Sequence, residues 1–342
     1  MQYTNFGNTG LIISRLCFGA MTFGVGDLVG ELKSSIGQDI ADEMIKKSLD
    51  AGINFFDTAD MYTAGQSESI LGKTLKDIRK DVVIATKCGF RSSESIISTG
   101  LSYRYITQSV ENSLKRLGTD YIDLFQLHVP DPHTPLEETA RALDYVINSG
   151  MVRYAGYSNF PAWQAQQLLD IQELNGMAKV ISAQMYYSLL GRDIEENTVQ
   201  FLEANNLGLM TWSPLAGGFL TGKYTKENPI PEDSRRAKFD FPPIDIEKGY
   251  DVVAKLKEIG NAHEASIAQV ALAWQLAKPY VSSVIIGANK MSQLEDNLGA
   301  VNIKLSDEEV NQLDDLTAIP QRYPAYFIPF GHDQKVKEAL NR

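Results

Sequence analysis

Short apolar runs alternate with amphipathic stretches along most of the chain. The runs are rich in β-branched and aromatic residues and predict strands, at 15–20, 53–57, 82–87, 121–128, 152–158, 180–184, 208–213 and 283–288. The stretches between them carry apolar residues three and four positions apart, which predicts helices, at 40–51, 67–79, 105–117, 136–149, 161–174, 194–205, 266–277 and 291–300.

This alternation predicts an α/β fold with a parallel sheet, because each crossover between parallel strands needs a helix's length of chain. Eight such units close most economically as a (β/α)8 TIM barrel. A doubly wound open sheet is the alternative, but no GxGxxG motif follows the first strand. We therefore predict one barrel domain over residues 1–342.

Three segments fall outside the repeating pattern. The turn sequence "NTGL" at 8–11 lies between short apolar stretches and predicts an N-terminal β-hairpin that plugs the bottom of the barrel. Residues 214–250 predict an overlong loop after the seventh strand, and residues 319–342 a C-terminal tail with prolines and aromatic side chains. Long loops at the C-terminal face of a barrel usually serve the site.

Charge and composition exclude several classes of function. A formal net charge of −11 over 342 residues argues against a nucleic-acid or membrane-surface partner. The N-terminus lacks the features of a secretory signal, and no apolar run is long enough to span a bilayer. Cys17 and Cys88 lie in predicted strands and resemble packed, reduced thiols. We expect a soluble cytoplasmic protein that acts on a small molecule.

Four reactive side chains follow consecutive predicted strands: Asp57, Tyr62, Lys87 and His128. Any one of them alone has a structural explanation, such as a helix cap or core packing. Catalytic groups of such barrels lie at the C-terminal strand ends, where these four would meet. There an ammonium lowers the pKa of a phenol, a carboxylate holds the ammonium, and a neutral imidazole orients a carbonyl. The set predicts a proton-donor site.

Several motifs resemble the aldo-keto reductase family in their order along the chain, among them "NFFDTADMY", "ATKCGF", "YIDLFQLHVPD", "GMVRYAGYSNF" and "IIGANKMSQLEDNLGA". The resemblance covers residues 3–318. It implies a (β/α)8 barrel that binds NADP(H) and transfers hydride to an aldehyde or ketone. It also implies that Tyr62 is the general acid of a tetrad with Asp57, Lys87 and His128.

The resemblance further implies a cofactor site at the strand ends. The positions that match the family are Gly19, Ala20 and Met21 on the pocket floor, Asp57, Ser158, Asn159 and Gln184 at the nicotinamide, Trp212 stacked on it, Ser213, Pro214, Leu215, Gly217, Lys223 and Arg235 near the pyrophosphate, and Gly287, Asn289, Lys290, Gln293, Asp296 and Asn297 around the adenosine. Many members carry basic residues where Gly287 and Gln293 stand here. Lys290 is therefore the expected cation for a 2′-phosphate, with Arg235 as the second candidate.

Two other functions compete with carbonyl reduction. Some relatives of the family are NADP(H)-binding regulatory subunits, although the intact His128 and the short N-terminus argue against that role here. A Schiff-base aldolase would use Lys87 but no cofactor motifs. The substrate stays open among sugars, aryl aldehydes, ketones and larger carbonyls. An aromatic wall and plain surface packing are both compatible with Tyr103, Tyr105, Tyr323, Tyr326 and Phe327.

Overall fold

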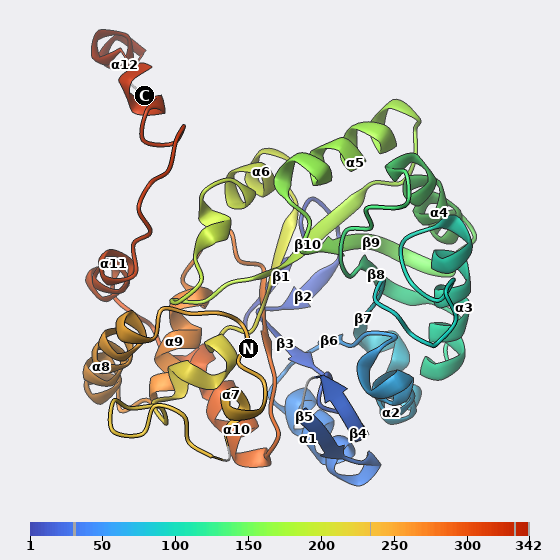
Figure 1. Ribbon diagram of the computed structural model, residues 1–342, viewed down its shortest axis with the longest axis horizontal. Coiled ribbons are helices and arrows are strands. Elements are labelled where there is room, and N and C mark those ends of the chain that lie inside the picture. Colours follow the sequence, from blue (N-terminus) through green and yellow to red (C-terminus); the bar gives the residue numbers. More distant parts are fainter. Residues whose placement is uncertain (30–31, 233, 332, 341–342) are drawn as a thin grey trace.

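A computed structural model describes residues 1–29, 32–232, 234–331 and 333–340. Its centre is a closed barrel in which every strand is parallel to its neighbours (Figure 1). In order around the barrel the strands are β3 (Leu16–Gly19), β6 (Phe55–Asp57), β7 (Val83–Cys88), β8 (Ile122–Leu127), β9 (Val152–Ser158), β10 (Val180–Tyr186), β11 (Gly208–Trp212) and β12 (Ser283–Ile286). The predicted (β/α)8 barrel is confirmed.

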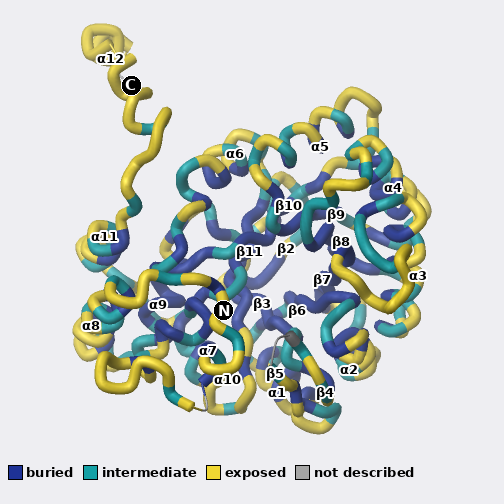
Figure 2. Tube along the Cα trace, in the orientation of Figure 1, coloured by how far each residue is buried: buried dark blue, intermediate teal, exposed yellow. Residues whose placement is uncertain are grey.

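Helices surround the barrel and turn one face toward it, so that their inner sides are buried and their outer sides exposed (Figure 2). The eight predicted helices correspond to α1 (Gln38–Asp50), α2 (Gln66–Leu75), α3 (Tyr103–Leu117), α4 (Leu136–Asn148), α5 (Ala162–Leu174), α6 (Thr198–Ala204), α9 (Ile267–Leu276) and α10 (Met291–Gly299). Their starts follow local sequence signals: Ser102 accepts a hydrogen bond from the Tyr105 amide, and Ser266 forms a capping box with Gln269.

The barrel interior is filled with apolar side chains, closed at the bottom by the hairpin of β1 (Tyr3–Asn5) and β2 (Ile12–Ser14). Phe6, in the hairpin loop, is fully buried and packs edge-on against Phe55. This confirms the predicted N-terminal hairpin. Cys17 and Cys88 are buried free thiols, as predicted, and burial raises the pKa of both.

The loop after β3 forms a second hairpin that the sequence did not reveal, β4 (Gly24–Val29) with β5 (Leu32–Ile36). In Figure 1 it projects from the barrel beside α1. Its glycine-rich, charged sequence lacks the apolar alternation of a half-buried strand, because two of the three buried positions among its described residues are Gly24 and Ser34.

The predicted loop at 214–250 was wrong at its end. It contains η4 (Ala216–Thr221) and α7 (Arg235–Lys238), and its last residues begin α8 (Ile246–His263). Asp245 caps α8 by accepting a hydrogen bond from the Lys248 amide. Gly249, Val252 and Leu256 then place a buried face at helical spacing. Other elements are α11 (Asp307–Leu316) and the short η1 (Tyr62–Gly65), η2 (Lys76–Asp81), η3 (Asp193–Glu195) and η5 (Ala300–Asn302).

Beyond α11 the tail runs away from the barrel and ends in η6 (Ile328–Gly331) and α12 (Gln334–Leu340) (Figure 1). Its aromatic side chains are exposed, with Tyr323 at 73% and Phe330 at 81%. They therefore form no wall with the two tyrosines of α3. None of the helices within the described residues is long and apolar enough to cross a membrane.

Candidate active site

The barrel brings the four predicted reactive side chains together at the carboxyl ends of three consecutive strands. Asp57 is the last residue of β6, Lys87 lies near the end of β7, and His128 directly follows β8. Tyr62 opens η1 in the loop after β6. The Lys87 Nζ lies 2.6 Å from Asp57 Oδ2 and 3.3 Å from the Tyr62 hydroxyl. The ring centroids of Tyr62 and His128 are 5.9 Å apart.

Asp57 is held from three directions. Its Oδ2 faces Lys87, while its Oδ1 accepts hydrogen bonds from Gln184 at 2.8 Å and from Gln126 at 3.3 Å. All these groups are buried, so the carboxylate depends on them in place of water. Gln126 is a residue that the sequence reasoning missed. Its signal was a polar side chain two positions before His128, on a strand face whose other residues, Ile122 and Leu124, are apolar.

Lys87 is fully buried, yet it stays charged. Burial lowers the pKa of its ammonium, but Asp57 and Tyr62 together raise it further, so the net direction is above the ordinary value. Its third hydrogen bond goes to the carbonyl of Thr58, at 2.6 Å. The ammonium thus has three oxygen acceptors and no freedom to turn away from the phenol.

The pKa of Tyr62 moves against the expectation from sequence. Burial raises it, and this outweighs the lowering by the Lys87 ammonium, so the net direction is upward. The Lys87 ammonium lowers the pKa of the phenol, as predicted, but the prediction left out burial, which raises this pKa more. The phenol is therefore protonated at neutral pH and available as a donor.

His128 is neutral. Burial, and then the charge of Lys87, hold the pKa of its imidazole well below the ordinary value. Its Nδ1 is buried without a hydrogen-bond partner in the described part of the chain. The ring of Phe90 packs edge-on against the imidazole at 4.7 Å between centroids. A neutral imidazole beside a phenol can orient one carbonyl oxygen between them.

The loop that carries Tyr62 is strained. Thr63 and Ala64 have φ values of 48° and 53°, in the left-handed region that is unfavourable for residues other than glycine. Gly65 follows with a φ of 87°. Hydrogen bonds hold the loop in place: the Thr63 hydroxyl donates to the carbonyl of Phe23 at 2.8 Å, just before β4. The second hairpin thus fixes the Tyr62 loop.

A second cluster lies at the ends of β9, β10 and β11. The Asn159 amide donates to the His128 carbonyl and to the Ser158 hydroxyl, each at 2.9 Å. Trp212 Nε1 donates to Asn159 Oδ1 at 3.2 Å, which fixes the indole at the strand ends. One face of this indole is stacked on Phe241, with ring centroids 5.9 Å apart. These contacts place a flat aromatic surface beside the tetrad.

Comparison with known proteins identifies this arrangement. The pattern of the Aldo/keto reductase family matches residues 15–318. The chain belongs to the aldo/keto reductase family.

Three relatives illustrate the range of the aldo/keto reductases. A probable voltage-gated potassium channel subunit beta of Oryza sativa is 38% identical over 334 residues, 95% of this chain and 98% of the relative. A putative aryl-alcohol dehydrogenase of Schizosaccharomyces pombe is 34% identical over 340 residues (92% and 95%). The versiconal hemiacetal acetate reductase of Aspergillus parasiticus is 33% identical over 336 residues (92% and 96%).

The floor positions expected of an aldo/keto reductase lie beside Asp57. The Ala20 amide donates to the Asp57 carbonyl at 2.8 Å, and the Ala20 carbonyl accepts from Ser67. Gly19 is buried so closely that a Cβ would come 2.7 Å from the Ile285 side chain. Met21 is half-buried at the rim.

The segment after β11 has an irregular backbone. Ser213, Gly217 and Gly218 have positive φ values, and η4 is correspondingly irregular. Arg235 is largely buried, which lowers the pKa of its guanidinium, and its Nε has no hydrogen-bond partner among the described residues. A guanidinium nitrogen that is buried without a partner is suited to an anionic ligand such as a pyrophosphate. Lys223 is exposed, with its Nζ over the Tyr224 ring.

The predicted adenosine positions gather around the start of α10. Gly287, Asn289 and Lys290 are exposed, and a Cβ at Gly287 would meet nothing within 4 Å. A helix N-terminus with an adjacent lysine suits a phosphate. The remaining side chains have structural partners: Gln293 accepts from the Asn289 amide. Likewise, Asp296 accepts from Ser266, and Asn297 donates to the Gly287 carbonyl.

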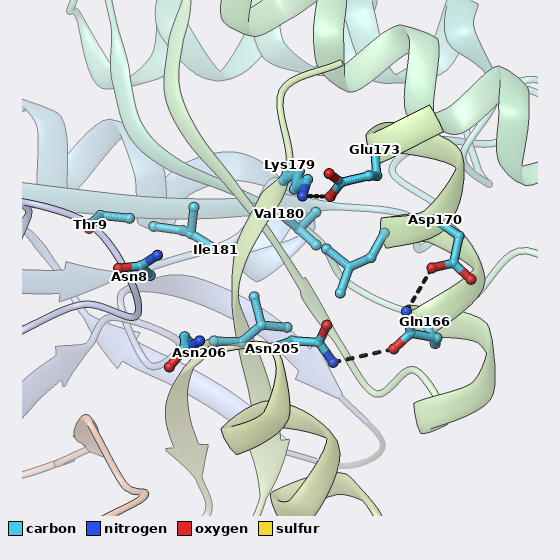
Figure 3. A pocket seen from close by; sticks show the side chains of 12 residues that line it. Asn8, Thr9, Gln166, Asp170, Glu173, Lys179, Val180, Ile181, Asn205 and Asn206 are labelled. Atoms are coloured by element: carbon cyan, nitrogen blue, oxygen red, sulfur yellow. Dashed lines mark hydrogen bonds and ion pairs between the residues drawn. The ribbon is translucent and has the colours of Figure 1, made fainter. Parts of the chain in front are cut away.

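The structure also has a cavity of about 270 Å³ far from this site, at the opposite end of the barrel (Figure 3). It lies where β10 begins, beside the turn of the N-terminal hairpin. Five of its polar side chains are partnered with one another: Gln166 bonds Asp170 and Asn205, and Lys179 pairs with Glu173. It offers no reactive group.

Proposed function

We propose that this protein is an NADPH-dependent reductase of aldehydes or ketones, reversible toward alcohol oxidation, with Tyr62 as the general acid. The observation that carries the proposal is the contact of the buried Lys87 ammonium with both the Asp57 carboxylate and the Tyr62 hydroxyl. A purely structural role of Lys87 would not explain why its ammonium contacts a phenol that is protonated, partly accessible and next to a neutral imidazole.

Bound NADP(H) would supply the hydride for the carbonyl carbon. The chain's own residues serve the oxygen. His128, being neutral, donates its one N–H to the carbonyl oxygen and orients it toward Tyr62. As negative charge develops on that oxygen, the Tyr62 hydroxyl gives up its proton. The resulting phenolate is stabilised by the Lys87 ammonium, which Asp57 and the Thr58 carbonyl hold in place.

The residues present fit the cofactor. Ser158, Asn159 and Gln184 present amide and hydroxyl groups beside the Trp212 indole, which would hold a nicotinamide carboxamide and ring. Gln184 now donates to Asp57, so cofactor binding would compete for this amide, while Gln126 would stay on the carboxylate. Arg235 would meet the pyrophosphate, and Lys290 the 2′-phosphate that distinguishes NADPH from NADH.

A second candidate is an NADP(H)-binding regulatory subunit with little turnover. It is favoured by the 38% identity to proteins named as probable potassium channel β subunits in Oryza sativa and Arabidopsis thaliana. The complete tetrad weighs against it, since a subunit that only binds the cofactor needs no proton donor.

The decisive experiment is a panel of carbonyl compounds, assayed by the loss of NADPH absorbance. It should include a small aldehyde, an aryl aldehyde, a ketone and an aldose. Turnover of any of them that is lost in Tyr62→Phe supports the reductase. If NADPH binds tightly but no member of the panel is reduced faster by the protein than by Tyr62→Phe, the binding subunit is the better description.

A further inference from the structure

A buried polar cluster lies behind the tetrad and has no part in the mechanism above. Asp60 precedes Tyr62 by two residues and is only 4% exposed. Its Oδ2 lies 3.3 Å from the Tyr105 hydroxyl and 3.0 Å from the Ser109 hydroxyl, both on α3. Its Oδ1 has no hydrogen-bond partner among the residues that the structure describes. An unsatisfied buried carboxylate oxygen needs an explanation.

Tyr105 connects this carboxyl group with the loop after β7. Besides Asp60, its hydroxyl lies 3.3 Å from the Phe90 carbonyl and 2.9 Å from the Ser92 hydroxyl. Phe90 is the residue whose ring packs on the catalytic imidazole. Tyr105 is thus the junction between the segment that leads to Tyr62 and the wall that covers His128.

The phenol of Tyr105 has only one proton, and this proton has competing acceptors. When Asp60 is ionised, the carboxylate is the strongest acceptor and takes the hydrogen bond, so the Phe90 carbonyl loses its donor. When Asp60 is protonated, its own O–H can donate to the Tyr105 oxygen. The phenol is then free to donate to the Phe90 carbonyl, while Ser92 donates to the remaining lone pair.

We propose that Asp60 and Tyr105 are positioning residues for Phe90, whose ring forms a wall of the substrate site beside His128. Protonated Asp60 lets Tyr105 hold Phe90 against His128, and ionised Asp60 draws the Tyr105 hydroxyl away. The wall would then be firm at lower pH and looser at higher pH. Its effect on the reaction rests on the proposed reductase function, but the movement of the loop does not.

The surrounding charges place this change near neutrality. The ionisable groups that face Asp60 are Glu68 on α2, Arg116 on α3 and Cys88 on β7, besides Tyr105. Glu68 is itself paired with Arg116 at 2.5 Å. Burial first, and Glu68 second, raise the pKa of Asp60 to about 7, although Ser109, Arg116 and Tyr105 oppose the rise.

The consequence for substrates depends on their size. An aryl aldehyde would touch the Phe90 wall, whereas propanal would not reach it. Between pH 6 and pH 8 the KM for the aryl aldehyde should rise by roughly two- to tenfold, the value of one edge-on aromatic contact. The KM for propanal should stay constant. The kcat for both aldehydes should depend on proton donation by Tyr62 and not on the protonation of Asp60.

Three variants separate this role from a structural one. Asp60→Asn should keep the low KM for the aryl aldehyde at every pH, because the amide donates to Tyr105 permanently. Tyr105→Phe should have the high KM at every pH. Ser109→Ala is the matched control: it removes a bond to Asp60 but touches no loop residue. It should keep both limiting KM values and shift the transition to higher pH, because a hydrogen-bond donor to the ionised carboxylate is lost.

Amide hydrogen exchange tests the loop without any activity. The amides of Ser92 and Gly100 are hydrogen-bonded within residues 89–102, at 3.0 and 2.9 Å. At pH 8 the exchange rates of these two amides in the wild type should equal those in Tyr105→Phe. At pH 6 they should equal those in Asp60→Asn. Equal exchange in all three proteins at both pH values would overturn the proposal. If Tyr105→Phe does not fold, the test is the comparison of Asp60→Asn with the wild type at pH 8. Slower amide exchange in Asp60→Asn supports the proposal, and equal exchange refutes the proposal.

Failure of the proposed function would look different from failure of this inference. If no carbonyl is reduced but the exchange pattern is found, the positioning role stands and the reductase does not. If carbonyls are reduced while the exchange pattern and the KM profile are flat, the reductase stands and the role of Asp60 falls.

Discussion

Lys87 contacts Asp57 more closely than it contacts Tyr62: its Nζ lies 2.6 Å from the carboxylate oxygen and 3.3 Å from the phenol oxygen. The longer contact matters because a full hydrogen bond from the ammonium would stabilise phenolate before the substrate arrives. In the proposed mechanism, an ammonium at 3.3 Å strengthens its contact as charge develops on the phenol, which would favour the transition state over the ground state.

The first prediction concerns the general acid. Tyr62→Phe keeps the ring that packs near His128 but removes the proton donor, so kcat for a good aldehyde should fall by about 10²–10⁴-fold. NADPH affinity, measured by fluorescence quenching, should be nearly unchanged. Tyr145→Phe, on the exposed face of α4, is the control and should retain full activity. Near-normal turnover in Tyr62→Phe would refute the mechanism.

The second prediction concerns the buried ion pair. Lys87→Met leaves the Asp57 carboxylate buried without its cation, which should lower the free energy of unfolding by about 3–5 kcal/mol. Adding Asp57→Asn removes the uncompensated charge and should restore part of that stability while activity stays low. Urea denaturation of both variants measures this. If the double variant is no more stable than Lys87→Met, Asp57 does not carry the charge assigned to it.

The reactive side chains could be predicted because each follows a recognisable strand, and strand ends of a barrel converge. Gln126 and Phe90 could not be predicted in the same way. Their roles depend on which side chains they meet in the folded chain: the polarity of Gln126 marks the residue but not its partner Asp57, and nothing in the sequence marks Phe90 as a neighbour of His128. Similarly, the pKa of Tyr62 depends on the balance of burial against the Lys87 charge, and burial is a property of the folded chain.

The same limit applies to the fold. Periodicity located the barrel strands, but the β4–β5 hairpin buries Gly24 and Ser34, which give no apolar signal in the sequence. The sequence predicts a loop where α8 starts, because Gly249 and the charges beside it resemble a connection. Only packing against the barrel shows that Gly249 is buried, with the Phe219 ring where a side chain would stand.

The third prediction concerns cofactor preference. Lys290 is exposed at the start of α10, where a 2′-phosphate would bind. Lys290→Ala should weaken NADPH by about 1.5–3 kcal/mol and leave NADH almost unaffected. Fluorescence titration with both cofactors measures the difference, and Lys257→Ala, an exposed lysine of α8, is the control. An equal loss for both cofactors would remove Lys290 from this role.

The fourth prediction concerns the tail. Because the aromatic side chains after α11 are exposed and lead away from the barrel, a chain ending at Thr317 should reduce a series of carbonyls with the same relative kcat/KM as the full chain. Its NADPH affinity should also be unchanged. A reordered substrate preference in the shortened protein would show that the tail folds over the site during catalysis.

The last prediction concerns stability and pH. Burial raises the pKa of Asp60 to about 7. In the unfolded chain an aspartate loses its proton near pH 4. Between these values the folded state holds a proton that the unfolded state has lost, so Asp60 makes the free energy of unfolding fall as pH rises, and the loss ends above about pH 7.

Asp60→Asn cannot ionise, so its advantage over the wild type should grow from pH 5 to pH 7, by at most about 1.4 kcal/mol per pH unit, and then level off. Urea denaturation at pH 5, 6, 7 and 8 measures this difference in the free energy of unfolding, and the contributions of other titrating groups largely cancel between the two proteins.

Asp131→Asn is the matched control. Burial raises the pKa of Asp131, but hydrogen bonds from Thr134, His133 and Leu101 lower it further, so its titration lies below this range. Its stability difference from the wild type should therefore be constant from pH 5 to pH 8. A constant difference for Asp60→Asn as well would mean that Asp60 is ionised throughout, and that Tyr105 always donates to the carboxylate.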